Sequence, residues 1–70
     1  MEFQLKTDFI ELDNLLKALN LVTNGAQAKE CILASKVKVN GQVESRIRRK
    51  LRFGDMVEFD SNQIKIIKTE

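Results

Sequence analysis

Twelve of the 70 residues are lysine or arginine, and eight of these cations fall between residues 24 and 52. The same stretch holds only two acids, Glu30 and Glu44, so it carries a formal charge of +6, whereas the rest of the chain carries −4. Cations gathered in one segment, with the neutralising acids elsewhere, are typical of a surface that binds a polyanion. A solvated surface that is merely rich in lysine would give the same count.

The segment from Arg46 to Phe53 could provide this chemistry most directly. Read with the period of a β-strand, its cations fall on one face and Ile47, Leu51 and Phe53 on the other, and only Arg49 breaks the alternation. An extended strand would space the cations about 6.6–6.8 Å apart, as a ladder for phosphates. A helix would also bring Ile47 and Leu51 together, so the pattern leaves the conformation open. The predicted ladder consists of Arg46, Arg48, Lys50 and Arg52.

Residue types that perform catalysis are scarce in this chain. Histidine is absent, which removes the commonest general base and a common metal ligand. Cys31 lies in an apolar helical stripe without a histidine partner, so we expect it to pack in the core. The acids near residues 11–13 and 55–60 are placed as helix caps and turn residues. We therefore predict no enzymatic activity, no cofactor and no metal site.

Length and composition predict one small soluble domain that spans residues 1–70. With 43% apolar and 31% charged residues, the chain resembles ordinary globular proteins rather than disordered segments. No apolar run reaches the ~18–20 residues that cross a membrane, and no signal-peptide pattern opens the chain. A single cysteine cannot form an internal disulfide, which fits a reducing compartment. We expect a cytoplasmic protein.

The N-terminal part of the sequence predicts a strand followed by a helix. Residues 2–6 alternate, with Phe3 and Leu5 on one face, as in an edge strand. Asp8 can cap a helix that runs from Phe9 to Asn20. Four leucines recur in this helix at helical spacing and form an apolar stripe that belongs in the core. They are Leu12, Leu15, Leu16 and Leu19.

A second helix is predicted from Asn24 to about Ala34. Asn24 is a good N-cap, and Gln27 stands where a capping-box side chain would stand. The N–H groups at this helix end could also bind a phosphate, with simple capping as the alternative. Lys29 should reach solvent beside that end. The residues expected to be buried are Ala28, Cys31 and Ile32.

Asn40-Gly41, flanked by valines, predicts a β-hairpin. A two-residue loop would pair Val39 with Gln42. A three-residue loop of residues 39–41 would pair Val37 with Val43 instead, and we prefer it because it keeps valine opposite valine.

Either loop leaves Lys36 and Lys38 on the same solvent face. Downstream, the sequence predicts turns at Gly54-Asp55 and at residues 60–62, with strands at residues 56–59 and 64–67. The predicted fold class is therefore α+β, with two N-terminal helices packed on a small, mostly antiparallel sheet.

Several of these elements follow one another in the order of a known family. They are Leu12-Asp13, the run from Asn24 to Lys29, Ile32, the run from Val37 to Gly41, and Gly54-Asp55. The ordered set, over about residues 9–59, resembles the RNA-binding domain first recognised in ribosomal protein S-four, also called the alpha-L motif. The chain departs from that family at Asn24-Gly25, where many members have Ser-Arg, and at Ser35-Lys36, where members commonly carry glycine. The run from Asn24-Gly25 to Ala28-Lys29, together with Arg46, Arg48 and Lys50, looks more like the small stand-alone bacterial group typified by YbcJ and YaaA.

This resemblance implies an RNA partner, such as ribosomal RNA or transfer RNA, and a ribosome-associated role. The charge pattern leads to the same prediction independently. We expect contacts to phosphates rather than bases, because the chain has no tryptophan or tyrosine and its four phenylalanines fall at apolar positions. The predicted RNA-binding residues are Asn24, Gln27, Lys29, Lys36, Lys38, Arg46, Arg48, Lys50 and Arg52.

The alternative is an adaptor whose basic face docks an acidic protein, because carboxylates and phosphates attract the same cations. A protein partner would need an anchor such as an exposed aromatic side chain, and the sequence indicates none. Duplex DNA is a weaker third reading. The cations fall mainly on predicted extended segments rather than on a recognition helix.

Overall fold

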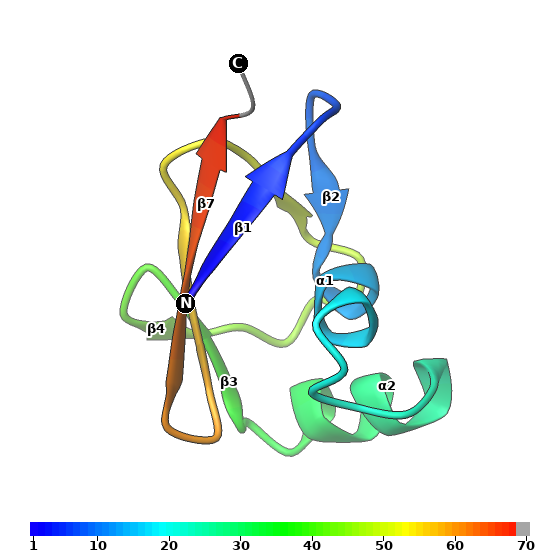
Figure 1. Ribbon diagram of the computed structural model, residues 1–70. Coiled ribbons are helices and arrows are strands. Elements are labelled where there is room, and N and C mark those ends of the chain that lie inside the picture. Colours follow the sequence, from blue (N-terminus) through cyan, green and yellow to red (C-terminus); the bar gives the residue numbers. More distant parts are fainter. Residues whose placement is uncertain (69–70) are drawn as a thin grey trace.

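The computed structural model describes residues 1–68 as two short helices packed against a curved five-stranded sheet (Figure 1). The elements are β1 (Glu2–Leu5), β2 (Ile10–Glu11), α1 (Leu12–Ala18), α2 (Gly25–Leu33), β3 (Val37–Val39), β4 (Gln42–Val43), β5 (Lys50–Leu51), β6 (Met56–Phe59) and β7 (Asn62–Lys68). The sheet order is β1-β7-β6-β3-β4, in which β1 is parallel to β7 and the other pairs are antiparallel. Strands β2 and β5 form a separate antiparallel pair. The predicted α+β fold is confirmed.

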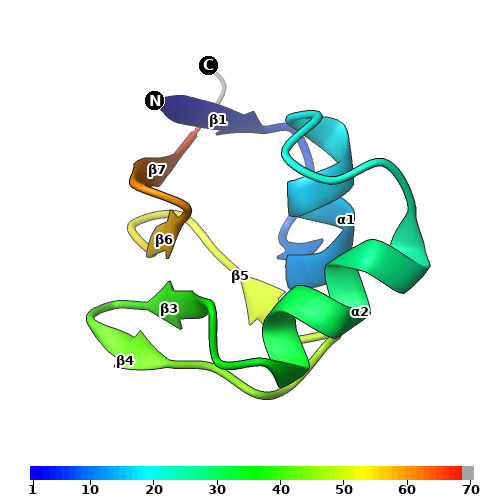
Figure 2. The same ribbon diagram turned by 90° about the horizontal axis from the view of Figure 1, so that it is seen from below.

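The core lies between the sheet and the helices. Viewed from below, the strands follow one another around one side of the molecule, the two helices lie on the other, and β5 lies between them (Figure 2). Strands β3, β6 and β7 alternate in burial, so each sends every second side chain into this core. The predicted leucine stripe is buried at three positions, and Leu19 is half-buried. The largest fully buried side chains are Leu12, Leu15, Leu16, Ile32, Leu51, Ile64, Ile66, Val37 and Val57.

Helix α1 begins later than the sequence predicts, and Asp8 does not cap it. Residues 10 and 11 pair with β5 instead. The Leu12 N–H donates to the Arg49 carbonyl at 2.9 Å and the Asp13 N–H to the Ile47 carbonyl at 3.1 Å, and no side chain caps the helix. A distant stretch of backbone thus satisfies the donors that a side-chain cap usually serves. Among the described residues, neither helix is long and apolar enough to cross a membrane.

Helix α2 confirms the predicted Asn24 cap. The Asn24 Oδ1 accepts the Gln27 N–H at 2.9 Å, and the Gln27 Oε1 accepts the Thr23 N–H at 2.6 Å, one residue earlier than in a standard capping box. At the other end, Ser35 has φ +62°, and the Lys36 N–H returns to the Cys31 carbonyl at 3.1 Å. Serine therefore occupies the left-handed position that glycine favours.

The β3–β4 hairpin has the two-residue loop, so the preferred three-residue loop is wrong. Val39 pairs with Gln42 and Lys38 with Val43, which leaves Val43 52% exposed. Positive φ angles at Asn40 (+53°) and Gly41 (+83°) are the pattern of a type I′ turn. This turn matches the twist of its strands, and that advantage outweighs the pairing of two valines.

Asn40 fastens this hairpin to the turn before β6. Its N–H donates to the Met56 carbonyl at 2.7 Å, its Oδ1 accepts the Met56 N–H at 2.9 Å, and its Nδ2 donates to the Asp55 Oδ1 at 3.0 Å. The Asn40-Gly41 and Gly54-Asp55 pairs, far apart in sequence, are therefore joined by hydrogen bonds.

The segment from Arg46 to Phe53 is not the extended ladder that the alternation predicts. Only Lys50 and Leu51 are in a strand, and the Arg49 N–H donates to the Arg46 carbonyl at 3.3 Å across a turn. Phe53 is 65% exposed instead of buried, because β5 ends at Leu51 and the alternation ends with it. The strand that the alternation predicts therefore forms only at Lys50 and Leu51, and the residues before and after them are not in a strand.

Candidate nucleic-acid interface

The backbone of residues 46–51 is held firmly against the body of the protein. Carbonyls of this segment accept the first N–H groups of α1, and β5 pairs with β2. Leu51 is fully buried and Ile47 is partly buried against the core. Because the apolar side chains and the carbonyls face inward, the basic side chains of this segment extend away from the core.

Glu44 organises two of those side chains. It is 6% exposed, and its carboxylate accepts hydrogen bonds from Arg46 Nε at 3.0 Å, Arg46 Nη2 at 3.1 Å and Arg49 Nη1 at 2.7 Å. It also accepts the Arg46 backbone N–H at 2.9 Å. The Arg46 hydrogen bonds, opposed by burial and reinforced by Arg49, lower the pKa of Glu44 to about 2. The carboxylate therefore stays ionised and holds both guanidinium groups in place.

Four basic side chains surround an open hollow beside Glu44, which we call the arginine depression. Its lining residues are Arg46, Arg48, Arg49 and Lys50. With Glu44 counted against them, these four cations give the site a formal charge of +3. The Arg46 side chain is 70% exposed, so the guanidinium donors that do not bind Glu44 face solvent. Such donors match the geometry of phosphate oxygens.

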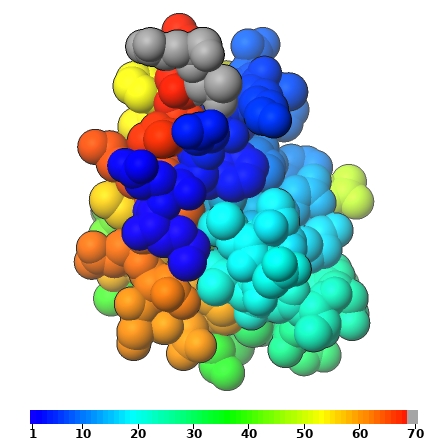
Figure 3. Space-filling view, viewed as in Figure 1, coloured from blue at the N-terminus to red at the C-terminus, as the bar shows by residue number. Residues whose placement is uncertain are grey.

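The ring of Phe9, the residue before β2, lies next to the basic side chains of Lys50 and Arg52. Lys50 Nζ lies 4.8 Å from the centroid of the Phe9 ring, and Arg52 Cζ lies 6.0 Å from it. Cations at these distances are attracted to the ring face. We call the arginine depression together with Arg52 the cationic surface. In the space-filling view, the yellow-green atoms of residues 46–50 reach the front of the molecule only at its right margin (Figure 3).

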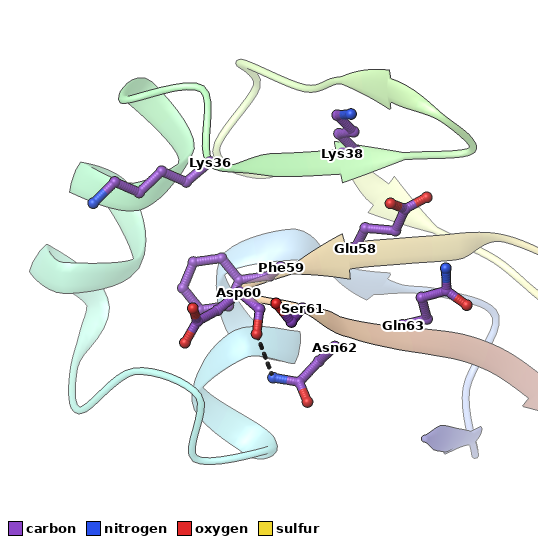
Figure 4. Close-up of a pocket in the computed structure, with 8 residues that line it drawn as sticks. All are labelled: Lys36, Lys38, Glu58, Phe59, Asp60, Ser61, Asn62 and Gln63. Atoms are coloured by element: carbon purple, nitrogen blue, oxygen red, sulfur yellow. Dashed lines mark hydrogen bonds between the residues drawn. The ribbon is translucent and has the colours of Figure 1, made fainter.

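Lys36 and Lys38 lie in a different place, which we call the lysine groove. Both are exposed, as predicted, but they line the groove together with Glu58 and Asp60. Lys38 is directly opposite Glu58 in the β3–β6 pairing. In the close-up, Lys36 extends toward α2, whereas Lys38 and Glu58 project from neighbouring strands (Figure 4). Two lysines against two carboxylates leave this groove with a formal charge of zero.

The remaining predicted residues are on or beside α2. Lys29 is exposed on the helix surface. The Asn24 and Gln27 oxygens are used for capping, as described above. None of these three residues lines the arginine depression. The structure therefore brings Arg46, Arg48 and Lys50 together and keeps the helix residues apart from them.

Sequence reasoning missed two members of this site, Arg49 and Glu44. Arg49 was set aside because it breaks the period of a strand, yet the turn at residues 46–49 directs its side chain to Glu44. The available signal was Glu44 itself, a single acid directly before five basic residues in the next eight positions. An acid among cations stays ionised, because nearby opposite charges favour its charged form, and it can then bind them.

Two further expectations concern metal ligands and Cys31 within residues 1–68. No group of three or more histidine, cysteine, aspartate or glutamate side chains is arranged there to hold a metal ion. Cys31 is half-buried and packs against the core.

Comparison with known proteins identifies relatives of this chain. The sequence model described as the S4 domain matches residues 3–67. YbcJ of Escherichia coli is 39% identical over 62 residues, which cover 89% of this chain and 89% of that protein, and YbcJ of Shigella flexneri matches equally well. The solution structure of E. coli YbcJ superimposes with a TM-score of 0.71 over 94% of this chain and 85% of that one. That structure is described as revealing an alpha-L motif involved in RNA binding.

Proposed function

The chain belongs to the S4 domain family, and we propose that it is a small RNA-binding protein that holds structured RNA by its backbone phosphates. The observation that carries this proposal is the arginine depression, whose four cations are only partly offset by one buried carboxylate. The RNA binding described for the YbcJ alpha-L motif supports the same partner for this chain. We propose ribosomal RNA or transfer RNA as the class of target.

Glu44 makes this surface ready to bind before RNA arrives. A free arginine loses rotamer freedom when it contacts a phosphate, and that loss weakens binding. The Glu44 carboxylate already fixes Arg46 and Arg49 by three side-chain hydrogen bonds. Arg48 and Lys50, both exposed, can then adjust to the path of the strand. Part of the ordering cost is therefore met during folding.

The proposed partner is RNA with a defined shape rather than a defined sequence. Proteins recognise A-form helices mainly through phosphates and 2′-hydroxyl groups across the wide, shallow minor groove. A cluster in which Glu44 fixes two guanidinium groups is suited to phosphates, which are spaced differently in RNA and B-form DNA. We propose that the protein acts by binding alone.

A salt titration tests this proposal. Binding of a structured ribosomal RNA fragment, a tRNA and a DNA duplex of matched length would be measured from low to physiological salt. With about four to six phosphate contacts, the logarithm of the affinity for RNA should fall with the logarithm of salt at a slope of about −3 to −5. The DNA duplex should bind more weakly.

Two variants with equal charge locate the contacts. One replaces Arg48, Lys50 and Arg52 with glutamine. The control replaces Lys17, Lys65 and Lys68 with glutamine, and these lysines do not line the arginine depression. The first variant should flatten the RNA slope by about 2–3 units, and the control should leave it nearly unchanged. Equal slopes in the two variants, or equal binding of RNA and DNA, would contradict the proposal and favour an acidic protein partner.

A further inference from the structure

Phe53 is a large aromatic side chain that lies outside the core. It is 65% exposed, whereas Phe59 is buried and Phe3 and Phe9 are half-buried against neighbouring groups. It belongs neither to the core nor to the residues packed against the core. At 65% exposure the ring gains little from burial in the free protein, so most of its apolar surface is available to a partner.

Hydrogen bonds hold the turn that carries Phe53 in place. The Asp55 N–H donates to the Arg52 carbonyl at 3.0 Å, and the Arg52 N–H donates to Asp55 Oδ2 at 2.8 Å. Gly54, with φ +94°, gives the pattern of a type II turn, and its N–H donates to the Ile66 carbonyl at 3.0 Å. The other oxygen of Asp55 accepts the Asn40 Nδ2. Phe53 is thus carried by a turn, between β5 and β6 in Figure 2, that is fastened to both a strand and the hairpin.

Phe53 also lies at the end of the cationic surface. Arg52 precedes it directly, and Lys50 is three residues away, which places the two Cα atoms at most about 11 Å apart. A nucleic-acid strand whose phosphates contact Lys50 and Arg52 therefore passes close to the backbone that carries the ring. Aromatic side chains beside basic groups are how proteins bind unpaired nucleotides, by stacking on the base while the cations hold its phosphate.

From this geometry we infer that Phe53 is a stacking platform for an unpaired base of the bound RNA. The inference rests on the proposed function and narrows its target to structured RNA with a nucleotide unstacked beside the helix. It corrects the expectation that all four phenylalanines fall at apolar positions, and with it the main argument that bases are not contacted.

A base fits this ring better than a protein surface does. Protein hot spots gather several apolar groups around an aromatic anchor. The other large exposed apolar side chains among the described residues are Met1, Leu33 and Val43, on the N-terminus, α2 and β4, whereas the immediate sequence neighbours of Phe53 are Arg52 and Gly54. A single ring on the residue that follows an arginine offers one flat face and one nearby phosphate contact, which are what one nucleotide requires.

The test uses two RNA hairpins, one fully paired and one with a single bulged nucleotide. The bulged nucleotide carries the fluorescent base 2-aminopurine. Binding to each is measured for the wild type, Phe53→Ala, Phe53→Leu and Phe53→Trp, with Val43→Ala as a control for loss of another exposed apolar side chain. Phe53→Ala and Phe53→Leu should bind the bulged RNA about tenfold more weakly than the wild type, with little change for the fully paired RNA. Phe53→Trp and Val43→Ala should bind both RNAs like the wild type.

Fluorescence gives a second readout of stacking. The wild type and Phe53→Trp should alter the 2-aminopurine signal in the bulge, and Phe53→Ala should not. If Phe53→Ala binds both RNAs as tightly as the wild type does, stacking is overturned and the ring is left for a protein partner. If the wild type binds neither RNA, the proposed function itself fails, so the two failures are distinguishable.

Discussion

The arginine depression and the lysine groove both place cations at the surface, but they differ in what surrounds those cations. In the arginine depression, four cations share one buried carboxylate, which binds two of them and leaves a formal charge of +3. In the lysine groove, Lys36 and Lys38 share their walls with Glu58 and Asp60, and the formal charge is zero. Of the two regions, only the arginine depression has an excess of positive charge, and Glu44 holds two of its side chains in place.

The difference teaches that a count of cations along the sequence does not define a binding surface. Lys38 lies opposite Glu58 across a strand pair, so part of its attraction for a phosphate is cancelled nearby. Glu44 does the reverse, because its burial and its hydrogen bonds convert one negative charge into an anchor for two guanidinium groups. An acid can therefore weaken or strengthen a basic surface, depending on whether it lies beside the cations or beneath them.

Replacing Glu44 with glutamine should have the largest effect on folding. The neutral amide cannot hold both arginines as the carboxylate does, and we expect the free energy of unfolding to fall by about 1–2 kcal/mol at pH 7, a value reduced for the solvent exposure of Arg46. Urea denaturation would measure it. Glu58→Gln in the lysine groove is the matched control and should change stability by less than about 0.5 kcal/mol.

The contribution of Glu44 should depend on pH with a definite sign. Its pKa is about 2 in the folded protein and 4.5 without the fold, so the ionised form stabilises the protein above about pH 5. That stabilisation is lost as the pH falls from about 5 to about 2. The stability gap between wild type and Glu44→Gln should therefore close across this range, and a gap that stays constant would contradict the ion-pair account.

Glu44→Gln also separates positioning from charge. The variant is one unit more positive than the wild type, so simple attraction predicts tighter RNA binding. We expect weaker binding instead, by about threefold to fivefold, because Arg46 and Arg49 lose their fixed orientation. Tighter binding by the variant would show that Glu44 is only a neutralising charge.

Removing the acids of the lysine groove should make the two regions more alike. Glu58→Gln with Asp60→Asn would give the groove a formal charge of +2, and asparagine tolerates the left-handed φ of +51° at position 60. RNA affinity should rise about threefold above that of a control with Glu2→Gln and Glu30→Gln, which changes net charge equally. If both pairs of substitutions change RNA affinity equally, only net charge matters and the lysine groove does not contact the RNA.

The smallest expected effect concerns Phe9. Phe9→Leu keeps an apolar side chain but removes the ring face under Lys50 and Arg52, and we expect a loss of about 0.5–1 kcal/mol in stability and about twofold in RNA affinity. Phe3→Leu, another half-buried phenylalanine, is the control in thermal denaturation and RNA titration. Equal behaviour of the two variants would remove Phe9 from the account of the cationic surface.

Local chemistry made much of the fold predictable. The Asn24 cap, the Asn40-Gly41 turn and the alternation of β6 and β7 each depend on residues close together in sequence. The wrong choice of hairpin loop was also local, since it overlooked the twist of the type I′ turn, whereas the wrong start of α1 came from contact with a distant segment. Helix α1 starts at Leu12 because the carbonyls of Ile47 and Arg49 meet its first N–H groups. No pattern within residues 8–12 contains that information.

The candidate site was predictable in composition but not in geometry. Arg46, Arg48 and Lys50 were expected together and lie together, although a turn replaces the expected strand. Lys36 and Lys38 were assigned to the same surface, but the acids that share their groove come from β6 and the turn after it. The pairing of β3 with β6 decides that neighbourhood, and hydrophobic alternation does not specify which strands pair.

The most direct measurement compares two variants that each lose two charges. Arg48→Gln with Lys50→Gln alters the arginine depression, and Lys36→Gln with Lys38→Gln alters the lysine groove, while circular dichroism verifies that both remain folded. At moderate salt, the first pair should lower RNA affinity at least tenfold and flatten the salt slope by about 2 units, whereas the second should lower affinity less than threefold. Equal losses, or a larger loss from the lysine pair, would contradict the claim that the arginine depression is where this protein holds RNA.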